Sequence, residues 1–268
     1  MLGDGGGIQA ESIRKLKTSL DFLNLDRGAR TIMVTSAVPR EGKSTTIANL
    51  AVAYARSGRR VALVDLDLRR PSLHTFFYTG VSRGIFDVVM GEENLGDALR
   101  RISFPVTGPM ANASRSRNGS KPRATARTVD DEADRCLLNL LPAGSIPPHS
   151  ADVLADFLES ERLNSVIEDL ESQFDLVLID APPLLAVGDA IALTSRVDAL
   201  FLVLHAASQR PLLQELARQL HSSPVPVLGF VLTGVSDSEA YGGYGYGYGY
   251  DAYGADVPAK PERATPRV

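Results

Sequence analysis

Residues 36 to 46, SAVPREGKSTT, combine the groups that hold a nucleotide's phosphates. Their core reads A-x-x-x-x-G-K-S-T, which matches the P-loop pattern except that Ala37 stands at the first glycine. Such a loop needs backbone N–H groups around phosphate oxygens, a lysine for the β and γ phosphates, and a hydroxyl for Mg²⁺. Gly42, Lys43, Ser44 and Thr45 supply these in order. Because the loop follows an apolar strand pattern and opens a helical one, the sequence predicts a Mg²⁺–nucleotide site.

Acidic and basic side chains follow two further apolar runs. The stretch VALVDLDLRRP carries Asp65, Asp67 and Arg69, and the stretch DLVLIDAPP carries Asp180. In an open α/β sheet the carboxyl ends of the strands line the ligand crevice, so these carboxylates should face one Mg²⁺–nucleotide. Arg69 would bind its phosphates or pair with a nearby acid. Helix capping is the usual alternative role, and it applies to Asp67 more than to Asp180, which Ala-Pro-Pro follows without an immediate helix.

Short apolar runs alternate with helical patterns along the chain, which is typical of a parallel sheet covered on both faces. Apolar residues from Ile47 to Tyr54 fall at i, i+3, i+4 and i+7, so Tyr54 should lie in the core. We expect Tyr78 to pack with Phe76 and Phe77. The predicted fold is α/β, a doubly wound, mainly parallel sheet of the P-loop NTPase type. Its predicted strands are residues 31–36, 61–67, 137–141, 175–180, 199–204 and 227–234.

Two segments interrupt this pattern. Residues 103–135 are rich in Ser, Arg, Gly and Pro without apolar periodicity, which predicts a disordered insertion. Residues 241–268 begin with YGGYGYGYGYDAYG, where frequent glycine disfavours a packed strand and predicts an exposed, flexible tail. The predicted organisation is a linker at 1–10, a P-loop domain at 11–240 and this tail. The tail holds six of the eight tyrosines: Tyr241, Tyr244, Tyr246, Tyr248, Tyr250 and Tyr253.

Composition narrows the class of protein. The 268 residues are 44% hydrophobic, enough for one large core, and the net charge of −4 does not favour nucleic-acid binding. The single cysteine, Cys136, excludes an internal disulfide framework and fits a reducing compartment. No apolar run reaches the roughly eighteen residues of a membrane helix, and MLGDGGGIQ lacks the features of a secretory signal. We therefore expect a cytoplasmic chain, held at the membrane's inner face by an adaptor or a missing transmembrane portion.

With these residues in place, the chain resembles the bacterial tyrosine kinases, the P-loop autokinases that accompany capsule and exopolysaccharide export. The resemblance extends from about Glu11 to the tyrosine tract. It rests on VTSAVPREGKST as Walker A, VALVDLDLRRP as Walker A′, DLVLIDAPP as Walker B and the family stretch LPAGSIPPHSADVL. The helix ESIRKLK resembles the family's Glu-x-x-Arg-x-x-Arg oligomerisation motif, with Lys17 at its second arginine. Thr233 stands where relatives carry an asparagine near the adenine, which bears on base selectivity.

The resemblance implies an ATP- and Mg²⁺-dependent kinase that phosphorylates its own tail tyrosines between subunits. Lys43 and the loop amides would hold the ATP phosphates. Ser44, Asp65 and Asp180 would organise Mg²⁺, and either Asp65 or Asp67 would accept the tyrosine proton.

The resemblance also implies partners. Subunits would form a ring through the helix that bears Glu11, Arg14 and Lys17. A transmembrane polysaccharide co-polymerase would act as adaptor, and a tyrosine phosphatase would reverse the modification. Nucleic acid is not an expected partner.

Two other functions are compatible with parts of the sequence. A ParA/MinD-like ATPase switch would explain the P-loop but not the tail. Those ATPases carry a signature lysine five residues before the P-loop lysine, where this chain has Val38. A self-associating or RNA-binding tail on a degenerate ATPase is the third reading, and the acidic net charge and the lack of arginine in the tyrosine tract weigh against RNA.

Overall fold

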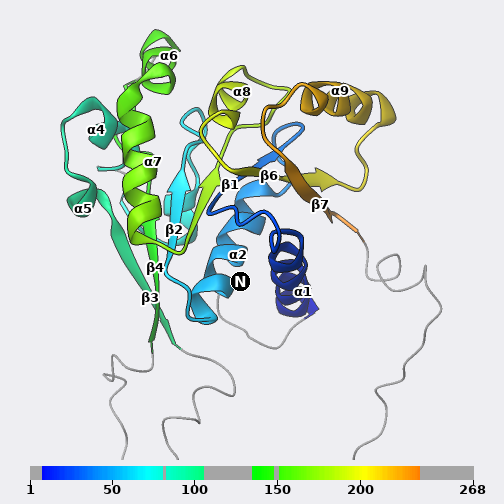
Figure 1. The fold of residues 1–268 in the computed structure, drawn as a ribbon, viewed down its shortest axis with the longest axis horizontal. Helices are drawn as coiled ribbons and strands as arrows, with labels where there is room; N and C mark the ends of the chain where they lie inside the picture. The colour runs from blue at the N-terminus through cyan, green and yellow to red at the C-terminus, as the bar shows by residue number, and fades with distance from the viewer. Residues whose placement is uncertain (1–7, 81–82, 106–134, 148–150, 236–268) are drawn as a thin grey trace, which may run out of the picture. The chain divides into compact units, whose positions relative to one another are not determined.

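The computed structural model describes residues 8–80, 83–105, 135–147 and 151–235, which form one seven-stranded sheet with helices on both faces (Figure 1). The strand order is β3-β4-β2-β5-β1-β6-β7. All neighbours pair in parallel except β3 and β4. The strands are β1 (Thr31–Ser36), β2 (Val61–Asp65), β3 (Arg100–Pro105), β4 (Arg135–Leu141), β5 (Leu176–Asp180), β6 (Ala199–His205) and β7 (Val227–Thr233).

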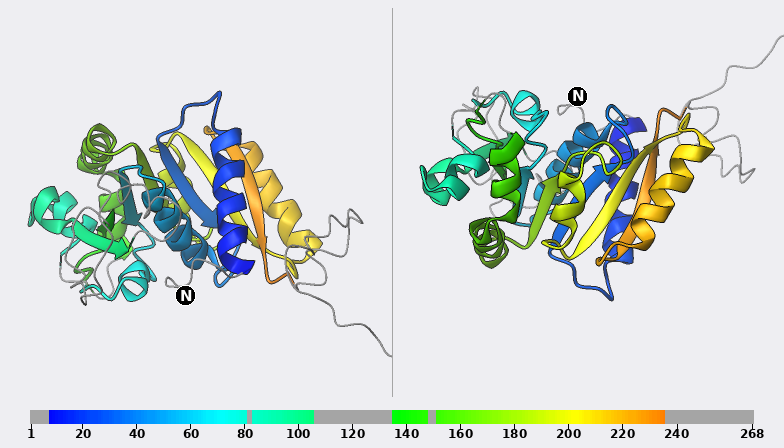
Figure 2. Two further views of the ribbon diagram at one scale, coloured as in Figure 1. Left: turned by 90° about the horizontal axis from the view of Figure 1, so that it is seen from below. Right: turned by 90° about the horizontal axis from the view of Figure 1, so that it is seen from above.

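Two layers of helices enclose this sheet (Figure 2). One face carries α1 (Ile8–Leu23), α2 (Lys43–Arg56) and α3 (Leu73–Phe76) over a core that includes Tyr54. The other face carries α4 (Ile85–Met90), α6 (Ala151–Glu159), α7 (Glu161–Gln173), α8 (Asp189–Thr194) and α9 (Arg210–His221). The short helix α5 (Leu95–Ala98) lies beside α4.

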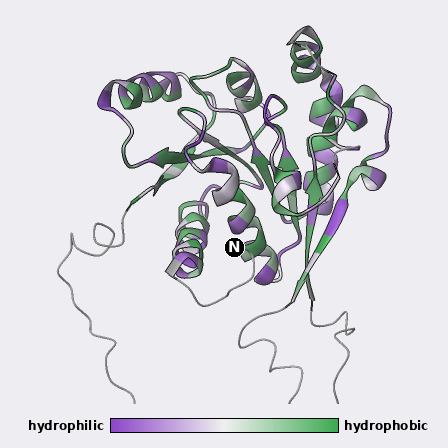
Figure 3. Ribbon diagram, turned by 180° about the vertical axis from the view of Figure 1, so that it is seen from behind, coloured by the Kyte–Doolittle hydropathy of each residue, from purple (hydrophilic) through white to green (hydrophobic). Residues whose placement is uncertain are grey.

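The central strands are apolar throughout because each of their faces meets a core. In β1, Ile32 and Val34 belong to the core under α2, whereas Met33 between them belongs to the opposite core. All six residues of β1 are buried. The hydrophobic colouring runs along the central strands, whereas α9 shows one hydrophobic and one hydrophilic side (Figure 3). Such a sheet positions the loops at its carboxyl edge rigidly, which a phosphate site requires.

The structure confirms the six predicted strands and the α/β class, and it adds β3, which sequence analysis missed. This strand, RRISFP, is an antiparallel edge strand paired with β4, with Phe104 opposite Cys136. The predicted insertion at 103–135 is therefore too long at both ends, because strands include Ser103 to Pro105 and Arg135. The remaining residues, 106–134, lie outside the described ones. Helix α1 begins at Ile8, inside the predicted linker, rather than at Glu11.

The chain divides into two compact units, Met1–Gly234 and Val235–Val268. The six tail tyrosines belong to the second unit and lie outside the described residues. Among the helices of the described ranges, none is long and apolar enough to cross a membrane.

Candidate active site

The phosphate loop joins the end of β1 to the first turn of α2, as predicted. Gly42 has φ 89°, a left-handed conformation that L side chains rarely adopt. A Cβ at Gly42 would also come within 3.3 Å of Thr233 Cγ2. Helix α2 begins at Lys43, so its unpaired N–H groups and the positive end of its dipole face the loop. Thr45 lies exposed on this first turn.

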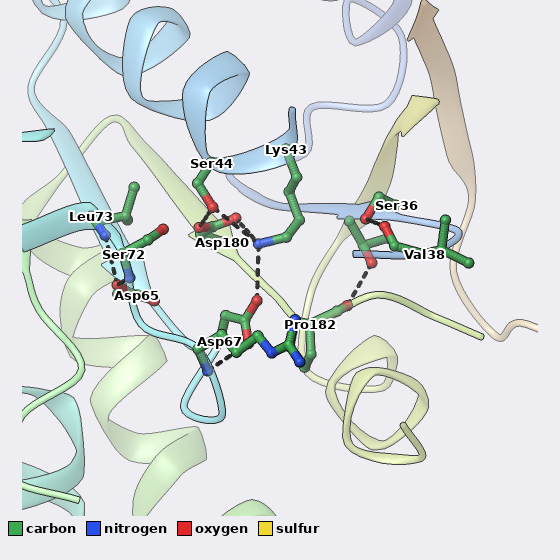
Figure 4. Close-up of polar contacts among 12 residues, drawn as sticks. Ser36, Val38, Lys43, Ser44, Asp65, Asp67, Ser72, Leu73, Asp180 and Pro182 are labelled. Atoms are coloured by element: carbon green, nitrogen blue, oxygen red, sulfur yellow. Dashed lines mark hydrogen bonds and ion pairs between the residues drawn. The ribbon is translucent and has the colours of Figure 1, made fainter. Parts of the chain in front are cut away.

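Lys43 is the centre of a buried polar cluster (Figure 4). Its Nζ donates to Asp180 Oδ1 at 2.5 Å and to Ser44 Oγ at 3.3 Å, and lies 3.3 Å from Asp67 Oδ2. The Ser44 hydroxyl donates to the other Asp180 oxygen at 2.7 Å. A lysine ammonium has three N–H donors. Asp180 and Ser44 accept two of them, and Asp67 lies at ion-pair distance, so a phosphate oxygen that binds Lys43 competes with these partners.

Burial and charge act against each other in this cluster. Burial lowers the pKa of Lys43, but the attraction of Asp180 and Asp67 outweighs it, so the pKa stands above its usual 10.5. Burial raises the pKa of Asp180 above 3.8, although Lys43 and Ser44 favour its charged form. Lys43 is the cation that stabilises these two carboxylates in a buried site, so its removal should lower the stability of the folded protein.

Asp65 serves the fold as well as the site. Its Oδ2 accepts the backbone N–H groups of Ser72 and Leu73, both at 3.0 Å, and so caps the start of α3. Its Oδ1 is buried and has no hydrogen-bond partner among the described residues. Burial, with the charge of Asp180 as the second cause, raises the pKa of Asp65 to about 7. Asp67, the predicted candidate for capping, instead accepts the N–H of Arg70 in a turn, at 3.3 Å.

These residues fit a nucleotide with Mg²⁺. The left-handed glycine and the start of α2 provide the cradle, and the Ser44 hydroxyl lies against Asp180, the pairing that a P-loop uses for Mg²⁺. The unpartnered Asp65 oxygen is a further ligand or water acceptor. Within the described ranges, no three His, Cys, Asp or Glu side chains form a metal site by themselves. Mg²⁺ in such sites keeps waters and binds substrate phosphates, so a full protein shell is not required.

Arg69 does not point into this cluster. Its guanidinium forms a two-point ion pair with Asp189 at the start of α8, at 2.6 and 3.2 Å. Arg69 lies in the loop after β2, and Asp189 is the first residue of the helix that follows β5. Of the two predicted roles, phosphate binding and pairing with an acid, the structure contains the pairing.

Glu41, inside the loop, is a site residue that sequence analysis missed. It is 3% exposed. Its Oε2 accepts the N–H groups of Ala37 at 2.8 Å and Val38 at 3.0 Å. Its Oε1 accepts the N–H of His205 at 3.2 Å and the hydroxyl of Ser208 at 2.8 Å. The carboxylate thus joins the phosphate loop to the chain after β6. The sequence did carry a signal for Glu41, namely an acidic residue inside an anion-binding loop. A buried carboxylate in that place must have several hydrogen-bond donors around it.

Comparisons with known proteins agree with this geometry. A family model described as the CobQ/CobB/MinD/ParA nucleotide binding domain matches residues 32–243. The tyrosine-protein kinase YwqD of Bacillus subtilis (strain 168) is 30% identical over 240 residues, covering 88% of this chain and 86% of YwqD. The solved BceF tyrosine kinase domain is 31% identical with a TM-score of 0.62, over 83% of this chain and 76% of that one. The chain belongs to the bacterial tyrosine kinase family.

Members of this tyrosine kinase family differ in length. The tyrosine-protein kinase Wzc of Salmonella typhimurium (strain LT2) is 31% identical over 189 residues, which are 70% of this chain but 21% of Wzc. The chain thus spans most of YwqD and a small part of Wzc.

The LPAG stretch, one of the motifs that suggested the family, has a structural role here. Gly144 has φ 95°, and a Cβ on it would lie 2.2 Å from Asp87 Oδ2. The buried Asp87 carboxylate accepts the N–H of Gly84 at 2.7 Å and that of Ser145 at 3.2 Å. Within the described part of this stretch, Gly144 and Ser145 therefore lock the end of β4 to the start of α4.

The predicted oligomerisation residues divide into two groups. Glu11 and Arg14 pair with each other at 2.7 Å on the exposed side of α1. Lys17 instead pairs with Asp21 at 2.9 Å and lies 5.0 Å from the ring centre of Tyr54, so it holds α1 against α2. The structure confirms Tyr54 as a core residue, 1% exposed.

The structure locates Thr233, whose effect on base selectivity stays a prediction, and it contradicts one expectation about Tyr78. The Thr233 hydroxyl donates to the Glu41 carbonyl at 2.6 Å, which ties the end of β7 to the phosphate loop. The predicted packing of Tyr78 with Phe76 and Phe77 is wrong, because Tyr78 is 96% exposed. Phe77 alone is buried, with its ring centre 6.3 Å from that of Phe104 on β3.

Proposed function

We propose that the chain is an ATP-dependent protein-tyrosine kinase that phosphorylates its own C-terminal tyrosines between subunits and thereby regulates capsule or exopolysaccharide synthesis and export. The observation that carries this proposal is the position of Lys43, buried at the start of α2 between the strand-end carboxylates Asp67 and Asp180. The relatives named as tyrosine-protein kinases and the tyrosine-rich tail supply the reaction class and the acceptor.

Lys43 and the loop amides would bind the ATP phosphates. Of the three partners of the Lys43 ammonium, Asp67 and Ser44 are the more distant at 3.3 Å, whereas Asp180 lies at 2.5 Å. We infer that the phosphate replaces Asp67, the weaker of the two carboxylate partners. When bound, Mg²⁺ would be held by Ser44 and Asp180, with Asp65 behind them, and would neutralise charge on the transferred phosphoryl group.

That exchange frees Asp67 to take the proton of the tyrosine hydroxyl. Asp65 is fully enclosed and caps α3, whereas Asp67 keeps a partly accessible carboxylate beside Lys43. A general base must first be within reach of the proton, so geometry favours Asp67. The tyrosine oxygen then bonds to the γ-phosphorus, the bond from that phosphorus to the bridging oxygen breaks, and ADP leaves with the electron pair.

The tail is the proposed acceptor because its sequence, with glycine beside most of the tyrosines, predicts a segment that can present each tyrosine to an active site. Glycine follows most of them and leaves room around each phenol. A cytoplasmic location at the inner membrane face, with a transmembrane co-polymerase as adaptor and a tyrosine phosphatase as opposing enzyme, belongs to the same proposal. Subunits would meet through the exposed side of α1, where Glu11 and Arg14 lie, with Lys17 acting within its own subunit.

The alternative is an ATPase switch of the ParA/MinD kind, and the matched family model includes those proteins. Val38 stands where they carry their signature lysine, and that difference favours the kinase. A switch would release phosphate to water and leave the tyrosines unmodified.

Mass spectrometry after incubation with Mg-ATP tests the proposal. Phosphate should be found on tyrosines between residues 241 and 253, and Lys43→Met should carry none. A chain with all six tail tyrosines changed to phenylalanine is the control, and it should lose the tail phosphates while retaining ATP binding. Phosphate on serine or threonine only, or unchanged labelling of Lys43→Met, would exclude the kinase.

A further inference from the structure

Tyr78 is the tyrosine that the fold leaves entirely to solvent. Of the two tyrosines in the described ranges, Tyr54 is 1% exposed and Tyr78 is 96% exposed. Tyr78 also has φ 54°, a left-handed conformation that a non-glycine residue adopts at a cost. Both features are unusual for a large aromatic side chain in a folded domain.

The local structure explains the backbone of Tyr78 but not its side chain. Tyr78 follows α3, whose last residue is Phe76, and the N–H of Thr79 closes the turn by donating to the His74 carbonyl at 3.0 Å. Left-handed residues end many helices this way, and glycine or asparagine usually fills the position. The side chain that packs into the core at this point is that of the preceding residue, Phe77, which contacts Phe104. Stability would thus favour glycine at 78, so the tyrosine has another use.

We propose that Tyr78 is a second phosphate-acceptor site of this kinase, separate from the tail and modified by another copy of the chain. The proposal rests on the proposed kinase function. A tyrosine kinase requires a phenol that is accessible to its active site, and Tyr78 meets that requirement inside the folded domain because it is 96% exposed. The residues after it, Thr79 and Gly80, are small, like the glycines that follow most tail tyrosines.

Transfer to Tyr78 is between copies because α3 is fixed to its own active site. The first two amides of the α3 segment, from Ser72 and Leu73, hold Asp65 Oδ2 at 3.0 Å. Tyr78 follows this fixed segment and is 96% exposed, whereas Lys43 of the same chain is 7% exposed, so the phenol does not lie in its own Lys43 cluster. In the transfer, the Tyr78 oxygen bonds to the γ-phosphorus of ATP in the other copy and ADP departs with the electron pair. The phenol proton passes to the carboxylate base of that copy.

The experiment uses the full chain incubated with Mg-ATP and mapped by mass spectrometry. The peptide that contains Tyr78 should carry one phosphate on tyrosine. A variant with all six tail tyrosines changed to phenylalanine should keep this phosphate, and adding Tyr78→Phe should remove it. At protein concentrations too low for the subunits to associate, the initial rate per chain should rise about in proportion to concentration, because another copy supplies the active site.

The outcomes separate this inference from the function on which it rests. Phosphate on tail tyrosines with an unmodified Tyr78 overturns the inference and leaves the kinase intact. A labelling rate at Tyr78 that does not change with concentration in this dilute range overturns the transfer between copies. A chain without phosphotyrosine anywhere overturns the proposed function itself.

Discussion

Replacing Lys43 with methionine should destabilise the nucleotide-free protein as well as abolish kinase activity. The ammonium lies 2.5 Å from Asp180, which is fully buried, and 3.3 Å from Asp67, whose side chain is 10% exposed. Methionine fills much of the same volume but leaves both carboxylates without their cation. Removing one partner of a buried ion pair costs about 3–5 kcal/mol, so we expect that loss in the free energy of unfolding at pH 8.

The loss should shrink at acidic pH. Burial already holds the folded-state pKa of Asp180 above 3.8, and without Lys43 that pKa rises further. A carboxyl group with a raised folded pKa costs nothing below its unfolded pKa and costs most above its folded pKa. Between those two values the penalty changes by about 1.4 kcal/mol per pH unit. The destabilisation of Lys43→Met should therefore be clearly smaller at pH 5 than at pH 8.

Urea unfolding of the nucleotide-free protein at both pH values measures this directly. Lys17→Met is a matched control, because the Lys17–Asp21 pair is partly exposed and its loss should cost on the order of 1 kcal/mol with little pH dependence. The double variant Lys43→Met with Asp180→Asn should recover part of the stability at pH 8. Equal losses for both lysine variants, or a Lys43→Met loss that is the same at pH 5 and pH 8, would refute the reasoning.

Three further predictions address other parts of the site. Asp65→Asn should raise the thermal unfolding temperature more at pH 8 than at pH 5. Burial raises the pKa of Asp65 from 3.8 to about 7, so the destabilisation by its charged form grows between these two values and is complete above the higher one. An equal shift at both pH values would contradict this. In kinetic assays, Glu41→Gln should raise the KM for ATP roughly tenfold with a smaller change in kcat, because an amide cannot accept all four hydrogen bonds that the Glu41 carboxylate accepts. Ser208→Ala, which removes one of the four donors, should have a weaker effect of the same kind. Glu11→Ala with Arg14→Ala should lower the mass of the assembly measured by light scattering. Because the Glu11–Arg14 ion pair is exposed, the double change should alter the free energy of unfolding by no more than about 1 kcal/mol. An unchanged mass would exclude both residues from the proposed interface between subunits.

Much of this architecture was predictable because the spacing of the apolar residues and the topology of a parallel sheet determine it. Apolar strands alternating with helices require a parallel sheet, and the carboxyl ends of its strands meet at one edge. Lys43, Asp67 and Asp180 could therefore be placed together although they are far apart in the sequence. Strand β3 was not predictable in this way, since RRISFP begins with two arginines, ends in proline and lies at the antiparallel edge.

The partners of individual charged side chains could not be predicted. Arg69 bonds to Asp189, 120 residues further along the chain, because the fold brings these two residues within reach and no sequence pattern records it. The same limit applies to Tyr78. Its exposure depends on the left-handed turn after α3, which directs the phenol away from the core that Phe77 enters.

The central claim is that the site around Lys43 transfers phosphate to tyrosine rather than to water. Measuring ADP formation and phosphotyrosine formation in the same reaction, with the adaptor's cytoplasmic segment present, tests it most directly. The account predicts that the two products form in equal amounts until the tail tyrosines are filled, and that Lys43→Met forms neither. Continued ADP and free phosphate production without phosphotyrosine would contradict it and would identify the chain as an ATPase switch.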